Sequence, residues 1–413
     1  MLLKRQTAKW LTSACLATTT LMSAALLIFT VRGGESFAYM MGHFPAPFGN
    51  EIRAGALEAF FALLFCSVSL FSVLGGMRDI FADIPREKIS HYFLMQNMLT
   101  GAMLAIVYTN DIFTAYVFID VITIAACSII SIKPGGKTLS ATMTYLIMSI
   151  IGSSLVLLSI AMLYGVTGHL LMPPLGESVG ILAATGEYTA PLFVLIGLIT
   201  AGLAIKSAQF PFHGWLPDAH TAATTAASAV LSGLIIKCYL VLLIKLGCRV
   251  FGIETLELLR IPHLLIALGA AGIVYGSWKA MNQRDVKRML SYSSIAQIGY
   301  ITAAIGLNTE AGLAAACFHI AVHAAAKAMM FTAAGGLAAV SGGGKDYDSL
   351  RGSARRAPLA GVAFIVGGLS LIGIPPFPGF ISKLYLASAS LETPFAFLVI
   401  PAEIGRASCR ERV

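Results

Sequence analysis

Several ionisable side chains occur in stretches of this sequence that are otherwise strongly apolar. A charged side chain at membrane depth costs roughly 2.5–3.5 kcal/mol on insertion scales, so each one requires a partner, water or a function. The residues concerned are Asp120, Lys206, Lys237, the row His319, His323 and Lys327, and Lys383. Carboxylate, amine and imidazole groups all exchange protons, and burial or a neighbouring charge moves their pKa values. These residue types therefore indicate a series of proton-carrying stations.

The histidine row has the most distinctive spacing. His319, His323 and Lys327 follow one another at four-residue intervals, which places the three side chains on one face of a helix. Two histidines with this spacing can also bind zinc, but the glutamate of a metalloprotease helix is missing and no third ligand is indicated. We therefore predict no metal site; a proton relay and a row of packing polar residues both fit this face.

Each of the other stations has a structural alternative. Lys206 and Lys383 lie near the ends of apolar runs, from which a lysine can extend its amine to the membrane interface. Asp120 could simply pair with a neighbouring lysine and fasten the bundle. Lys237 is more central in its run, which favours a functional role.

Prolines interrupt two of the apolar segments. FPFHGWLPDAH contains Pro211 and Pro217, and IPPFPGF contains Pro375, Pro376 and Pro378. Proline removes a backbone donor and opens the helical hydrogen-bond ladder, so both segments predict discontinuous helices. At membrane depth, irregular backbone is tolerated only where it is buried in protein or lines a water-filled cavity.

The two breaks are arranged in opposite order. Lys206 precedes the first break, and Lys383 follows the second. An inverted repeat would produce this order, and transporters build ion sites from such discontinuous helices. His213 and His220 lie beside the first break, where they could cap exposed carbonyls or carry protons, so they are secondary candidates.

The elements that carry these residues are predicted to be membrane-spanning helices. Hydrophobic residues make up 57% of the 413 residues, charged residues make up 12%, and the mean hydropathy is +0.82. A barrel would need short alternating strands instead of long apolar runs, so the predicted fold class is an all-α polytopic membrane protein. About eleven segments are long enough to cross the hydrocarbon core. They lie near 9–32, 55–77, 90–109, 112–131, 139–166, 188–208, 223–247, 262–280, 291–307, 311–340 and from 358 onward.

The basic residues follow the expected topology. A net charge of +8 could suggest a nucleic-acid partner, but the lysines and arginines gather in short loops and not along one face. They occupy every second loop, apart from one loop that contains Lys245, Arg249 and Arg260. We therefore expect a multi-pass protein of the cell (inner) membrane with a cytoplasmic N-terminus, surrounded by lipid, and no nucleic-acid partner.

No cofactor is predicted. The seven cysteines form no CxxC pair and no cluster-binding set. The stretch GGLAAVSGGGKD has the wrong glycine spacing for a phosphate loop, and an aspartate follows its lysine. The chain is expected to have no redox site of its own, so another subunit or an ion gradient must supply the energy for ion movement.

Four separated motifs, in the same order, resemble the antiporter-like membrane subunits of respiratory complex I, membrane-bound hydrogenases and Mrp-type Na⁺/H⁺ antiporters. The motifs are FPFHGWLPDAH with the preceding Lys206, QRDVKRMLSYSSIAQIGY, HIAVHAAAKAMMF and GIPPFPGFISK. The resemblance extends from about residue 40 to about residue 400. The early GHFPAPFGNEIRAG looks most like the D-type subunit of Mrp antiporters.

The resemblance implies a helical bundle with two inverted five-helix repeats and two discontinuous helices. It also implies a proton path through a carboxylate, lysines and histidines on successive helices. By motif, these roles fall on Asp120, Lys206, Lys237, His319, His323, Lys327 and Lys383. The family acid is usually glutamate; Asp120 is one methylene shorter, which would lengthen any direct contact with Lys206.

The expected organisation has three parts: N-terminal transmembrane helices over 1–89, a first antiporter-like repeat over 90–248, and a second, incomplete repeat over 262–402. Relatives normally have two helices before GHFPAPFG where this chain has one, so truncation at both ends is expected. The polar, basic stretch 403–413 resembles a translated sequencing adapter and is expected to be an artefact.

The predicted function is that of a membrane subunit that translocates protons, alone or in exchange for Na⁺, together with other membrane subunits of a larger complex. Two alternatives stay open. One is a membrane subunit of an NADH:quinone oxidoreductase or hydrogenase that contributes directly to quinone reduction, against which the missing redox ligands argue. The other is a structural subunit with a decayed channel, for which Asp120 is the one hint.

Overall fold

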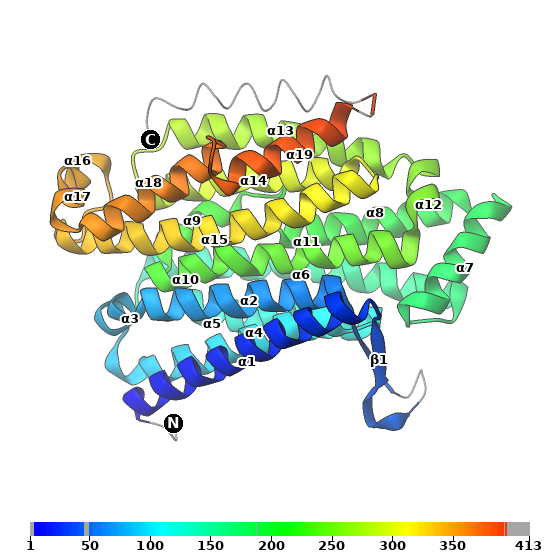
Figure 1. Ribbon diagram of the computed structural model, residues 1–413, viewed down its shortest axis with the longest axis horizontal. Coiled ribbons are helices and arrows are strands. Elements are labelled where there is room, and N and C mark those ends of the chain that lie inside the picture. Colours follow the sequence, from blue (N-terminus) through cyan, green and yellow to red (C-terminus); the bar gives the residue numbers. More distant parts are fainter. Residues whose placement is uncertain (1–3, 45–48, 187, 392, 395–413) are drawn as a thin grey trace.

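The computed structural model describes residues 4–44, 49–186, 188–391 and 393–394. Long helices lie side by side in a bundle, and a helix occupies each predicted membrane span (Figure 1). These helices are α1 (Arg5–Gly33), α2 (Ala56–Gly75), α4 (Ile89–Tyr108), α5 (Ile112–Ile130), α6 (Gly136–Thr167), α8 (Thr189–Lys206), α10 (Thr225–Val230) with α11 (Ile236–Leu246), α13 (Ile261–Met281), α14 (Val286–Gly306), α15 (Glu310–Val340) and α18 (Pro358–Ile372). The fold class predicted from the sequence is confirmed.

Eight helices in the described part of the chain are individually long and apolar enough to cross a membrane. Helices α4 and α14 are similar in length but contain more polar side chains, and α18 is the first half of a broken segment. Hydrocarbon thickness sets the length of such helices, which is why apolar run length predicted them well.

The span formed by α10 and α11 runs through the centre of the bundle. Every residue from 225 to 246 of this span is buried, as expected for a helix that is apolar on all sides. Figure 1 shows this span between α15 and α2. Two π-helical turns, η3 (Leu231–Ile235) and η4 (Gly247–Phe251), interrupt its regular hydrogen bonding. Such turns leave backbone groups available for other partners.

Two segments of the bundle are discontinuous. Helix α8 ends at Lys206, and α9 (Trp215–Ala222) continues after an interval that contains Pro211. Pro217 lies in the first turn of α9, where a proline costs no helical hydrogen bond.

The second discontinuous segment runs through α18 and α19. Helix α18 ends at Ile372, α19 (Pro378–Leu391) begins at Pro378, and Pro375 and Pro376 lie between them. The short helices α16 (Tyr347–Leu350) and α17 (Ser353–Arg356) lead into α18 through a bend of 116°.

Several smaller elements were not predicted. Strands β1 (Phe37–Met40) and β2 (Glu51–Ala54) form an antiparallel hairpin with Phe37 opposite Ala54, and it projects from one end of the bundle (Figure 1). The other additions are η1 (Met41–His43), α3 (Met77–Asp83), η2 (Arg86–Lys88), α7 (Met172–Thr185) and α12 (Ile253–Leu258). The stretch 403–413 lies outside the described residues.

Glycines bring α6 and α8 into close contact. A Cβ added to Gly202 would lie 2.6 Å from the carbonyl oxygen of Gly152 and 2.7 Å from Cγ2 of Val156. Small residues at helix crossings allow such backbone contact in membrane bundles. Because Lys206 lies one turn beyond Gly202, this contact fixes the end of α8 against α6.

We predict that Gly202→Ala destabilises the protein by about 1–3 kcal/mol, because the added methyl group forces α6 and α8 apart. Thermal unfolding in detergent measures the effect. The matched control is Gly197→Ala on the same helix, where an added Cβ has no atom within 4 Å. The control should be neutral or stabilising by up to about 1 kcal/mol, since alanine favours helix more than glycine does. Equal effects of the two substitutions would contradict the prediction.

Candidate ion-translocation site

Asp120 and Lys206 connect α5 to the end of α8. Their Oδ1 and Nζ atoms are 3.9 Å apart, at the outer limit of an ion pair. Lys206 is buried and donates a hydrogen bond of 2.6 Å to Oγ1 of Thr123, while Ser153 donates one of 2.5 Å to Oδ1 of Asp120. The side chain of Asp120 is 40% exposed. Each charged group thus has a hydroxyl group as its hydrogen-bond partner, and the two charges themselves are 3.9 Å apart.

Lys237 lies at the centre of the bundle on α11. Its side chain is completely buried and donates a hydrogen bond to the backbone carbonyl of Ser232, inside the π turn η3. The hydroxyl group of Ser232 lies 2.9 Å from that of Ser294 on α14. The irregular turn therefore supplies the acceptor for the buried amine and also contacts the next helix.

A polar segment of α14 holds the lysine of α15. Lys327 donates to the carbonyl of Leu290 over 2.7 Å and also to the hydroxyl group of Ser293. Ser294 donates to the same Leu290 carbonyl over 3.0 Å. Through Ser232, this segment connects the surroundings of Lys327 to those of Lys237.

The two histidines of α15 lie one turn apart and are buried, with ring centroids 6.3 Å from each other. His319 has contacts at both ring nitrogens. Its Nε2 lies 2.8 Å from Oε1 of Gln297 on α14, and its Nδ1 lies 2.9 Å from Oγ of Ser382 on α19. This histidine therefore joins three helices by hydrogen bonds.

Lys383 folds back across the second helix break. Its amine donates to the carbonyls of Leu371 (3.0 Å) and Ile372 (2.8 Å), at the C-terminal end of α18. It also lies 5.0 Å from the ring centroid of Tyr300. The two breaks thus both have a lysine beside them, but the lysines use different partners.

The secondary candidates are packed against aromatic rings. His213 lies 5.6 Å from Phe210 and 4.8 Å from Tyr275 between ring centroids, and His220 stacks on Phe331 at 4.7 Å. Among the described residues, neither ring nitrogen of His220 has a hydrogen-bond partner, so it does not cap a carbonyl there.

The placement of Lys245 and Arg249 in a loop was wrong. Lys245 is buried on α11 and donates to the carbonyls of Ile106, Val107 and Thr109 at the end of α4, over 3.2, 2.6 and 2.7 Å. Arg249 forms an ion pair of 2.5 Å with Glu58, which is buried on α2. These charges fasten helices together, which explains why they departed from the loop pattern.

The polar residues that contact the stations were also missed. They are Thr123, Ser153, Ser232, Ser293, Ser294, Gln297 and Ser382. Serine and threonine are common in membrane helices, where they bond to their own backbone or to neighbouring helices. The one available signal was the polar cluster SYSS with a following Gln297 inside a predicted span.

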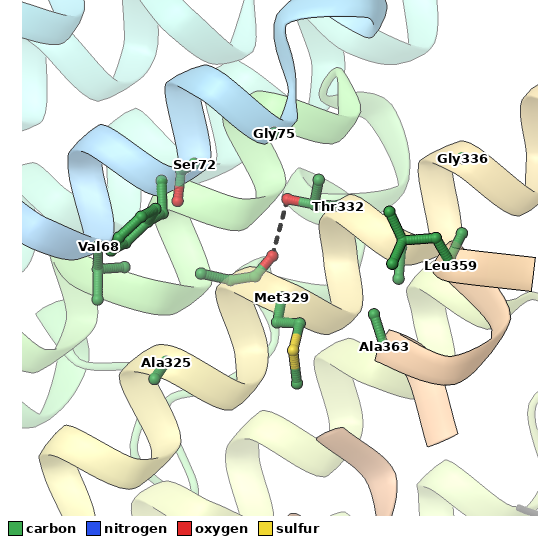
Figure 2. Close-up of a pocket in the computed structure, with 13 residues that line it drawn as sticks. Val68, Ser72, Gly75, Ala325, Met329, Thr332, Gly336, Leu359 and Ala363 are labelled. Carbon is green, nitrogen blue, oxygen red and sulfur yellow. Dashed lines mark hydrogen bonds between the residues drawn. The ribbon is translucent and has the colours of Figure 1, made fainter. Parts of the chain in front are cut away.

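A pocket lies between α2, α15 and α18 (Figure 2), and its volume is about 520 Å³. Val68, Met329 and Leu359 are among its apolar lining residues, and the hydroxyl group of Thr332 is turned to the carbonyl of Ala328, 2.8 Å away. None of the stations is among the residues that line it, so the pocket is separate from the polar series. No group of three potential metal ligands occurs in the described residues.

A bundle of long apolar helices, with two breaks that each lie beside a lysine, defines a polytopic membrane protein. Residues 109–405 match the family described as NADH:quinone oxidoreductase/Mrp antiporter, transmembrane, and the chain belongs to this family. The resemblance drawn from the four motifs is thereby confirmed.

Curated relatives include subunits of an NADH-quinone oxidoreductase and of a Na⁺/H⁺ antiporter. The chain is 33% identical over 380 residues to the N subunit of the NADH-quinone oxidoreductase of Desulforudis audaxviator, covering 89% of this chain and 72% of the relative. It is 29% identical over 354 residues to the D-type subunit of the Na⁺/H⁺ antiporter of Alkalihalophilus pseudofirmus, covering 85% of this chain and 69% of the relative.

Two solved membrane complexes contain similar chains. One is the membrane-bound sulfane sulfur reductase, an archaeal respiratory complex, with a TM-score of 0.87 and 28% identity over 98% of this chain and 81% of that one. The other is the Mrp complex of Dietzia, with a TM-score of 0.88, 24% identity, and coverage of 98% and 74%, which shows the shared fold.

We predict that Arg249→Met destabilises the protein by about 3–5 kcal/mol, because it leaves the buried Glu58 carboxylate without its partner. Thermal unfolding of the detergent-solubilised protein measures this loss. Lys133→Met is the control, since Lys133 pairs with Asp83 over 3.9 Å on the surface. That exposed pair should contribute about 1 kcal/mol or less. Comparable losses in both variants would be the contrary result.

Proposed function

We propose that this chain is the proton-translocating membrane subunit of a multisubunit complex, moving protons alone or in exchange for Na⁺. The observation that carries the proposal is the Asp120–Lys206 pair, a carboxylate and an amine 3.9 Å apart at the end of a broken membrane helix. An amine and a carboxylate whose separation changes can capture and release a proton, because each charge stabilises the other.

The remaining stations would continue the path towards α19. Hydroxyl and carbonyl groups of Ser232, Ser294 and Leu290 lie between Lys237 and Lys327. The histidines of α15 would then lead to Lys383 through Ser382. Water molecules would bridge the gaps between these groups, since irregular backbone at membrane depth is tolerated where it lines a water-filled cavity. In this proposal His213 and His220 stay secondary candidates.

The proposal includes the organisation and location of the chain. The repeats would occupy 90–248 and 262–402, because each range contains one broken helix. The lysine precedes the break in the first range and follows the break in the second. The N-terminus would be cytoplasmic, and the bilayer would be the cell (inner) membrane. Other membrane subunits of an Mrp, complex I or hydrogenase-type assembly would be the partners, since the curated relatives are named as subunits of an NADH-quinone oxidoreductase and of a Na⁺/H⁺ antiporter.

The two alternatives have less support. The shorter acid had suggested a decayed channel, but Asp120 lies within ion-pair distance of Lys206 and the intervening hydroxyl groups hold both charges. Direct quinone reduction has no site among the described residues that favours it over translocation. One relative is named as a subunit of an NADH-quinone oxidoreductase, and that name does not assign quinone reduction to the subunit itself.

We expect Lys206→Ala and Lys237→Ala each to abolish proton transport by the intact complex. Both substitutions remove an amine that is completely or almost completely buried. Transport is measured with a pH-sensitive dye in sealed vesicles, with and without Na⁺, after native electrophoresis has confirmed assembly. Lys137→Ala, at an exposed position in the first turn of α6, is the control and should transport normally. Normal transport by an assembled Lys206→Ala complex would overturn the proposal.

Substitutions at Asp120 separate charge from length. Asp120→Asn should reduce transport at least tenfold, because the amide cannot compensate the Lys206 charge or accept a proton. Asp120→Glu should retain most of the transport, because it restores the family acid and can close the 3.9 Å separation. The same vesicle assay reports both rates. Full activity of Asp120→Asn would show that the pair has a structural role alone.

A further inference from the structure

The hydroxyl group of Ser382 has two neighbours that compete for one proton. Its Oγ lies 3.0 Å from the carbonyl oxygen of Gly379, in the first turn of α19, and 2.9 Å from Nδ1 of His319 on α15. A serine hydroxyl has one hydrogen to donate and two lone pairs to accept with. It can therefore donate to Gly379 or to His319, but not to both.

The partner of the opposite ring nitrogen determines which arrangement occurs. Oε1 of Gln297 lies 2.8 Å from Nε2 of His319 and accepts from it, so Nε2 carries a hydrogen. When His319 is neutral, Nδ1 has a lone pair and accepts from Ser382. When His319 is protonated, Nδ1 donates to Ser382, and the hydroxyl group turns to the Gly379 carbonyl.

We propose that Ser382 is a positioning residue whose hydroxyl group turns between His319 and Gly379 as His319 gains and loses a proton. The inference rests on the proposed function, since it assumes that His319 carries protons. Ser382 supplies the acceptor that a protonated His319 needs in a buried site, and a hydrogen bond to a charged donor is stronger than one between neutral groups.

The turning hydroxyl group of Ser382 links His319 to the second helix break. Ser382 is followed directly by Lys383, whose amine donates to the last carbonyls of α18. Both contacts therefore originate from the first turns of α19, one reaching α15 and the other reaching α18. A proton on His319 reorganises the hydrogen bonds of the turn that holds Lys383, which gives the two stations a direct physical connection.

Other titratable groups surround this histidine. Tyr300 of α14 has its ring centroid 5.6 Å from that of His319, and His323 of α15 lies at 6.3 Å. Lys383 of α19 lies over the same Tyr300 ring, 5.0 Å from its centroid. The further charged groups on the elements that pack here are Lys237 and Lys245 on α11, Lys287 and Arg288 on α14, and Glu310 and Lys327 on α15. The test must separate the effect of Ser382 from the charges of these neighbours, so it compares uncharged substitutions.

The experiment measures proton transport by the assembled complex in vesicles over a range of pH. Ser382→Ala should lower the rate roughly 10- to 100-fold, the effect of losing a hydrogen bond to a charged group. It should also move the pH profile to lower pH, because the proton on His319 loses its acceptor. Ser382→Thr retains the hydroxyl group and should restore the rate to within about threefold.

Ser390→Ala is the matched control on the same helix. The Ser390 hydroxyl group also donates three residues back, to Ala387 over 2.8 Å, and is equally buried. Its loss should leave the rate and the pH profile unchanged. In the double variant Ser382→Ala with His319→Gln, the rate should equal that of His319→Gln alone, since the two residues act together.

Contrary outcomes are distinguishable. If His319→Gln and Lys206→Ala impair transport but Ser382→Ala behaves like Ser390→Ala, the inference on Ser382 is wrong and the proposed function stands. A lower rate in Ser382→Ala with an unchanged pH profile would likewise reduce Ser382 to a packing role. If neither His319→Gln nor Lys206→Ala affects transport, the proposed function itself fails. Ser382→Cys, of similar size but with weak hydrogen bonding, provides the same comparison if the alanine variant does not assemble.

Discussion

An amine buried among membrane helices must be solvated by the protein itself, and much of this structure follows from that constraint. In a regular α-helix each carbonyl already accepts from the residue four positions on, so few acceptors are available. Here three of the buried or partly buried amines reach carbonyls where a helix is irregular or ends. Lys245 uses the end of α4, Lys383 the end of α18, and Lys237 a carbonyl in the π turn. Interruptions of the helices thus hold three of the amines, whereas Lys327 is held by a carbonyl and a hydroxyl group within α14.

Helix α14 shows how one polar face serves several stations. Leu290, Ser293, Ser294 and Gln297 lie within about two turns and contact groups on η3 and α15. The opposite side of α14 packs closely on α13, where a Cβ added to Gly299 would lie 2.6 Å from the carbonyl of Gly269. Close packing on one side fixes the helix, so its hydroxyl and amide groups hold defined positions on the other.

Hydropathy predicted the helices well and their contacts poorly. Bilayer thickness determines how long an apolar run must be, and proline chemistry determines where it breaks, so the broken segments at Pro211 and Pro376 could be predicted. Neither rule says which hydroxyl group meets which charge. The contact of Lys206 with Thr123 and the contact of Lys245 with the end of α4 depend on how the helices rotate against one another. The β-hairpin was missed because its strands are short and lie outside the membrane pattern.

The two helix breaks hold charge in different ways, and the difference has a consequence. Lys206 lies near a carboxylate, so the pair can be neutral overall when both groups are ionised. Lys383 instead donates to backbone carbonyls at a helix C-terminus, where the helix dipole supplies only about half a negative charge. In the proposed path, Asp120 would compensate a proton on Lys206, and the last carbonyls of α18 would accept hydrogen bonds from a protonated Lys383. The two stations of the proposed path would thus stabilise the same charge by different means, with a side-chain carboxylate at one break and backbone carbonyls at the other.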